Sequence, residues 1–74
     1  MTTLMQLGMN AGTIWHLLDV MSEAVSVSFI QQRTGLSETE VLQAIGWLAR
    51  EGKIDFTEVN GQECVFLVPA NIYF

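Results

Sequence analysis

Positive charge is scarce in this sequence. Lysine and arginine together number 3 against 8 acidic residues, which gives a formal net charge of −5 at pH 7. Phosphate backbones are bound mainly through cations that displace counterions, and anionic membrane surfaces attract the same side chains. The charge balance therefore disfavours DNA as a partner and argues against binding to a membrane surface.

Cysteine, histidine and long apolar runs are also nearly absent. Cys64 and His16 are the single residues of their kinds, whereas a metal site or a Cys/His nucleophile needs several such groups to converge. No run approaches the ~20 apolar residues that span a bilayer, and the N-terminus lacks the basic start and apolar run of a signal peptide. We expect a cytoplasmic protein with no metal, no cofactor and no enzymatic activity.

Apolar residues, in contrast, are abundant. They make up 50% of a 74-residue chain, a length near the lower limit for a domain with a core of its own. So small a domain has little interior, so some apolar side chains should reach the surface, where a protein partner or a second copy covers them. We predict a single domain over residues 1–74, with a core of about 10–68 and an apolar tail at 69–74.

Residues 36–52 carry the clearest pattern, that of a helix with both ends specified. Ser37 and Glu40 have the spacing of a capping box, and Gly52 suits the left-handed residue that ends a helix. Apolar residues recur between them at helical spacing and predict the face that packs on the core: Val41, Leu42, Ile45, Leu48 and Ala49.

Two more helices and a short strand are expected upstream of this helix. Asn10 is a predicted N-cap for a helix that runs to about residue 23, and residues 1–9 carry no predicted element. Residues 24–27 favour a short strand that pairs with the wing. Ser28 predicts the start of a second helix that stops at Gly35. A short helix, a glycine-containing turn and a longer helix form the helix-turn-helix signature.

After Gly52 the apolar period changes from that of a helix to that of a strand. Residues 53–59 and 62–68 flank Asn60-Gly61, the strongest short signal for a type I′ hairpin. The two-residue loop sets Glu58 opposite Glu63, puts Cys64 on the outer face and predicts a core-facing set: Ile54, Phe56, Val65 and Leu67. The fold class is therefore α+β, a winged helix-turn-helix with three helices, a short strand and a C-terminal two-stranded hairpin wing.

Two segments resemble a family of small bacterial winged helix-turn-helix domains of unknown function. They are Asn-Ala-Gly-Thr-Ile-Trp-His-Leu-Leu at residues 10–18 and Ala-Ile-Gly-Trp-Leu-Ala-Arg-Glu at residues 44–51, with Thr-Gly-Leu-Ser-Glu between them. The resemblance covers roughly residues 10–59 and implies the fold and a stand-alone bacterial protein. It implies no activity, although the wider superfamily suggests transcription regulation.

The outward face of the third predicted helix is the candidate interaction surface. Helical periodicity assigns five residues to it: Thr39, Glu40, Gln43, Trp47 and Arg50. Trp47 is expected roughly opposite the core-facing side. It is either an anchor in a protein interface or a side chain covered by the wing or by the apolar residues of the tail, Ile72, Tyr73 and Phe74.

Two functions remain open for this surface. One is a protein-interaction or regulatory module that binds a protein partner, or a second copy as a homodimer, through this helix face and the tail. The other is a DNA-binding transcription regulator with the helix in the major groove, where Gln43 reads an adenine edge and Arg50 a guanine or a phosphate. The acidic first turn at Glu38 and Glu40, and a wing tip without cations, favour the first.

Overall fold

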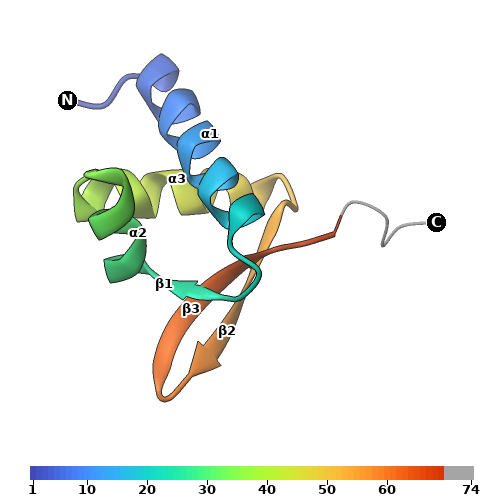
Figure 1. The fold of residues 1–74 in the computed structure, drawn as a ribbon. Helices are drawn as coiled ribbons and strands as arrows, with labels where there is room; N and C mark the ends of the chain where they lie inside the picture. The colour runs from blue at the N-terminus through green and yellow to red at the C-terminus, as the bar shows by residue number, and fades with distance from the viewer. Residues whose placement is uncertain (70–74) are drawn as a thin grey trace.

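Helices and strands follow one another in the order that the sequence predicts. The structure, a computed structural model, describes residues 1–69. Its elements are α1 (Leu4–Val20), β1 (Val25–Ser26), α2 (Val27–Thr34), α3 (Glu38–Arg50), β2 (Ile54–Val59) and β3 (Gln62–Leu67). The three helices pack together on one side of a three-stranded sheet, and the β2–β3 hairpin extends from them as the wing (Figure 1). The predicted α+β winged helix fold is confirmed.

The hairpin has the register that its loop sequence predicts. Asn60 and Gly61 both adopt positive φ, 55° and 80°, as a type I′ turn requires. Cα partners across the pair include Glu58 with Glu63 and Phe56 with Val65. The strand order is β1-β3-β2, so the last strand is the central one, and β1 pairs with it through Val25 and Val65.

The core lies where α1, α3 and the sheet meet. Ile14, Ile30 and Val41 are its largest fully buried side chains. The remaining buried apolar residues surround them: Ala11, Leu18, Val25, Ala44, Ile45, Leu48, Ile54, Cys64 and Val65. Within residues 1–69, no helix is both long and apolar enough to cross a membrane.

The first helix begins earlier and ends earlier than predicted. Thr3, not Asn10, is its N-cap, because the Thr3 hydroxyl accepts a hydrogen bond from the Gln6 backbone N–H at 3.0 Å. Asn10 is instead buried in mid-helix, where its Oδ1 accepts from Gln6 Nε2 at 3.1 Å. The helix ends at Val20 and not near residue 23. Residues 4–9, predicted to lack structure, are thus its first turns.

The N-cap of the second helix lies two residues before the predicted one. Ser26 Oγ accepts from the Phe29 backbone N–H at 3.1 Å, so Ser26 caps α2 and Ser28 lies inside it. The same residue is the last of β1, which leaves no linker between strand and helix. Gly35 ends the helix in the left-handed conformation, at φ 77°, as predicted.

Three burial predictions are wrong, and in each case tertiary neighbours are the reason. Leu42 on α3 is 51% exposed and Phe56 on β2 is 43% exposed, because α3 turns Ala44 rather than Leu42 to the core and β2 is an edge strand. Cys64, predicted on the outer face, is buried. It lies on the central strand, flanked by Ser26 of β1 and Thr57 of β2, which cover its small side chain from both sides.

Candidate interaction surface

The orientation of α3 is fixed at both of its ends. The capping box is complete, since Ser37 Oγ accepts from the Glu40 backbone N–H at 3.1 Å and Glu40 Oε1 accepts from the Ser37 backbone N–H at 2.9 Å. At the other end Gly52 has φ 72°, and the Lys53 backbone N–H donates to the Leu48 carbonyl at 3.0 Å. This backbone pattern is the one expected where a left-handed glycine ends a helix.

Burial of one side of α3 leaves the predicted outward residues facing solvent. Thr39, Gln43 and Arg50 are exposed, whereas Glu40 is half-buried. The Glu40 carboxylate already accepts the Ser37 N–H, so part of its hydrogen-bonding capacity serves the fold. The tail residues of the predicted surface, Ile72, Tyr73 and Phe74, lie outside the described residues, and so does the predicted cover of Trp47 by the tail.

Trp47 lies at the edge of α3 that borders α1, and not opposite the core as predicted. Its side chain is 37% exposed. It lines a shallow groove of about 350 Å³ between the two helices, which we call the α1–α3 groove. The lining residues come mainly from α1 and from the end of α3: Gly8, Ala11, Gly12, Trp15, His16, Trp47, Leu48, Glu51 and Lys53.

The cations of the chain do not converge on this surface. The Arg33 guanidinium on α2 lies over the Phe29 ring, 5.4 Å from its centroid. Lys53 Nζ lies 3.6 Å from Glu51 Oε1 at the exposed end of α3. Arg50 alone extends from the outward face. The wing brings acidic side chains together instead, because Glu58 pairs with Glu63 next to the turn.

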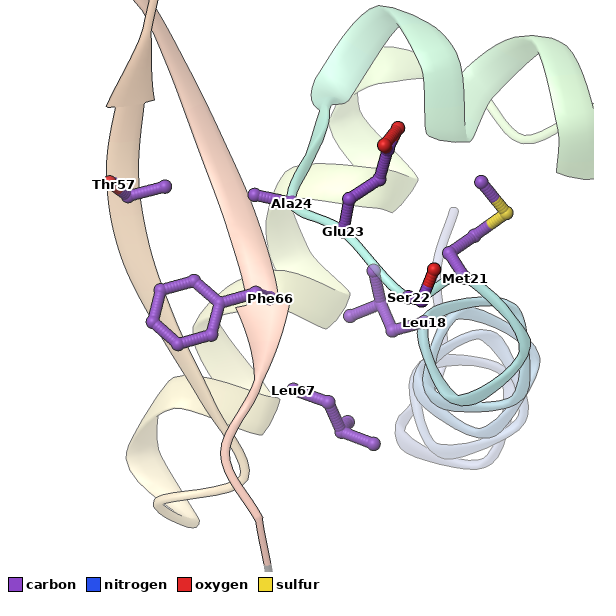
Figure 2. Close-up of a pocket in the computed structure, with 8 residues that line it drawn as sticks. All are labelled: Leu18, Met21, Ser22, Glu23, Ala24, Thr57, Phe66 and Leu67. Carbon is purple, nitrogen blue, oxygen red and sulfur yellow. The ribbon is translucent and has the colours of Figure 1, made fainter.

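A second hollow lies between the end of α1 and the wing, and Figure 2 shows the side chains that line it. It has a volume of about 330 Å³ and is lined by residues of α1, the following loop, β2 and β3: Leu18, Met21, Ser22, Glu23, Ala24, Thr57, Phe66 and Leu67. Glu23 is the one charged group in this set, so it offers no acid–base pair and no converging ligands. Among residues 1–69, no three His, Cys, Asp or Glu side chains are placed to hold a metal ion.

The α1–α3 groove is not among the predicted features, because no element was expected in residues 1–9. A signal for the helix was present, since Thr3 and Gln6 have the same spacing as Ser37 and Glu40. Gly8 and Gly12 stand four residues apart and therefore share one side of that helix. Knowing the helix start would have placed both glycines beside each other on its surface.

The sequence matches the model of a protein family described as a winged helix-turn-helix domain (DUF2582) over residues 1–67. It is 42% identical over 50 residues to the uncharacterized protein MJ1608 of Methanocaldococcus jannaschii, a match that covers 66% of this chain and 71% of that protein. Among solved structures, protein BT2368 from Bacteroides thetaiotaomicron is similar, with a TM-score of 0.73 and 33% identity over 82% of this chain and 73% of that one.

A structure of HOP2 is also similar, with a TM-score of 0.67 and 27% identity, over 80% of this chain and 98% of that one. That structure is described in terms of DNA recognition and protein interaction domains and of homologous DNA pairing.

Proposed function

Since the chain belongs to the DUF2582 family of winged helix-turn-helix domains, we propose that it is a non-enzymatic module that binds a protein partner. The contact surface in this proposal is formed by exposed residues of α3, Gln43 and Arg50, together with Trp47 at the edge that borders α1. Ile72, Tyr73 and Phe74 extend it in this proposal. The partner is a protein rather than DNA, and no cofactor or metal takes part.

The distribution of charge is the observation that carries this proposal. A winged helix reads DNA by placing its third helix in the major groove, where each phosphate nearby favours a cation. Here the first turn of α3 carries Glu38 and Glu40, and the wing sets Glu58 against Glu63. With a net charge of −5 on the whole chain, both elements that would meet the duplex repel it.

Trp47 supplies the apolar part of the surface. Its 37% exposure leaves a large aromatic area open beside the α1–α3 groove. Tryptophan is enriched among the residues that dominate binding energy in protein interfaces, typically where it enters a pocket and water is excluded. Gln43 and Arg50 lie on the same helix and are exposed, so they provide a polar rim.

The alternative function, a DNA-binding transcription regulator, rests on the similarity to HOP2, which is described in terms of DNA recognition. In that case Gln43 would pair with an adenine edge, and Arg50 with a guanine or a phosphate. Both side chains are exposed on α3, as this function requires.

Fluorescence anisotropy with labelled duplexes separates the two functions. At physiological salt we expect no binding of random or library-selected DNA at micromolar protein, because too few phosphates are neutralised. Nanomolar affinity that falls steeply with salt and is lost in Arg50→Ala would overturn the proposal in favour of DNA. Glu38→Lys combined with Glu58→Lys is the matched control, since it keeps the fold and reverses the charges that oppose DNA.

Affinity capture from a lysate of the native cell tests the protein partner. We expect a partner that is retained after nuclease treatment, is lost with Trp47→Ala and is weakened by truncation after Pro69. Leu42→Ala is the control, because Leu42 is also an exposed apolar residue of α3 but lies away from the groove. Equal loss in both variants, or a partner that disappears with nuclease, contradicts the proposal.

A further inference from the structure

The first turns of α1 form an apolar surface that the other described residues, up to Pro69, leave largely uncovered. Leu4, Met5 and Met9 are exposed at 77%, 78% and 62%. Asn10 is the first fully buried residue of the helix, and of residues 4–9 Leu7 packs against the core. Figure 1 shows these turns in blue beyond the other two helices. Residues 1–18 contain no Asp, Glu, Lys or Arg at all.

Gly8 and Gly12 lie on the same side of this helix, and the domain itself gives no reason for them. A Cβ atom at either position would meet nothing within 4 Å. Glycine weakens a helix relative to alanine, because it restricts the unfolded chain less. Both glycines border the α1–α3 groove, so they leave bare backbone where another helix can approach closely.

We propose that this face binds the same face of a second copy of the chain, with the two α1 helices antiparallel. Met5 and Gly12 are seven residues apart, about two helical turns, and so lie nearly in line on the helix surface. An antiparallel neighbour reverses their order, which places each Met5 against the bare backbone at the other Gly12. The surface thus fits itself through a two-fold axis, as a closed dimer requires.

Charge also favours a second copy in this orientation. No acidic residue stands in the first turn of α1, so the positive end of its helix dipole has no partner within the helix. Asp19 lies one turn beyond Trp15 on α1 and is the first charged side chain of the sequence. In the antiparallel pair the positive end of each α1 lies towards the Asp19 carboxylate of the other copy, whereas Glu51 is already paired with Lys53.

The size of the contact sets the expected strength. Burying a side chain such as Leu or Met removes on the order of 100 Å² of apolar surface. The three exposed side chains, the glycine backbone and the edge of Trp47 then give about 1,000 Å² over both copies, at the lower end for specific interfaces. The dimer is therefore reversible, with a dissociation constant in the micromolar range. This contact shares Trp47 with the proposed protein-binding surface, but it includes neither Gln43 nor Arg50 on the outward face of α3.

Sedimentation velocity of the full chain, from about 5 μM to 1 mM, tests the proposal. We expect a monomer–dimer equilibrium that Met5→Glu weakens at least ~10-fold, because the substitution buries a carboxylate in an apolar contact. Leu42→Glu, at an exposed apolar residue on the other side of α3, should leave the equilibrium unchanged. A chain that stays monomeric throughout, or a dimer indifferent to Met5→Glu, overturns the proposal.

Substitution of the glycines provides a second test, in which a folding defect is detected separately from loss of the dimer. Gly12→Leu should weaken the dimer at least ~10-fold while the Tm of a dilute sample, measured by circular dichroism, does not fall. Gly46→Leu is the matched control, since Gly46 is an exposed helix glycine of α3 with equal open space. Truncation after Pro69 should leave the dimer intact. Loss on truncation, or equal loss in both glycine variants, assigns self-association to another surface and overturns the proposal.

Discussion

α3 and the first turns of α1 are both rich in apolar residues, but they differ in what those residues contact. On α3 the apolar side chains line one side, and Val41, Ala44, Ile45 and Leu48 are all buried. On α1 three of the four Leu and Met side chains before Asn10 are exposed, Leu4, Met5 and Met9, and Leu7 is half-buried. Apolar residues that recur at the helical period thus mark the side of a helix that packs on the core, whereas the apolar residues at the start of α1 stay largely exposed.

The largest expected effect tests this contrast directly. Leu48→Ala should lower the free energy of unfolding by about 2–5 kcal/mol, because Leu48 is buried and its removal leaves a cavity. Leu4→Ala should change it by less than about 0.5 kcal/mol in a dilute sample, since Leu4 is exposed. Urea denaturation of both variants measures the difference. Similar urea midpoints for the two variants would mean that Leu48 and Leu4 contribute equally to stability, which contradicts the contrast between α3 and the first turns of α1.

Substitutions at the N-caps of α3 and α1 test the same comparison, with smaller expected changes in stability. Ser37→Ala removes one half of the capping box and should cost about 1 kcal/mol of global stability. Thr3→Ala removes an equivalent bond to Gln6, but residues 4–9 contain no fully buried side chain and Leu7 alone among them packs against the core, so these turns can fray more easily. Its global cost should be less than half as large, with faster hydrogen exchange confined to residues 4–9. Equal costs would show that the start of α1 folds with the core.

Helix glycines give the smallest expected effect, and it has the opposite sign. Gly46→Ala should raise the free energy of unfolding by about 0.5–1 kcal/mol, because the new methyl group meets nothing within 4 Å. Gly8→Ala should raise it less in a dilute sample, since the turn around Gly8 contributes little to the core. Thermal melts at low protein concentration measure both. A larger gain at Gly8 would contradict the contrast between the helices.

The sequence predicted well those features that a few neighbouring residues determine. The capping box at Ser37, the helix stops at Gly35 and Gly52, and the turn at Asn60-Gly61 each depend on residues within one turn of the chain. The same local rule applied to Thr3 and Gln6 would have found the start of α1. The start of α1 was not predicted because the apolar residues among residues 1–9 do not form one helical face. A helix without such a face is hard to recognise from sequence.

Burial and the candidate site were harder to predict, because both depend on segments far apart in the sequence. Phe56 follows the alternation of a buried strand but lies on the edge of the sheet, and Cys64 is buried by strands on both sides. The prediction for the position of Trp47 was wrong for the same reason, because α1 lies beside this side chain. Periodicity gives the direction of a side chain from its own helix and not the element that lies there.

The strand order has a consequence for how the molecule folds. β3 is the last element among residues 1–69, yet β1 and β2 both pair with it. Val25 of β1 pairs with Val65, which is about forty residues later in the sequence, so β1 has no strand partner until these distant segments meet. Closing so long a loop is slow relative to forming helices. We therefore expect sheet formation to follow helix formation, and a chain cut short before β3 would lose every strand pairing of the sheet and Val65 from the core.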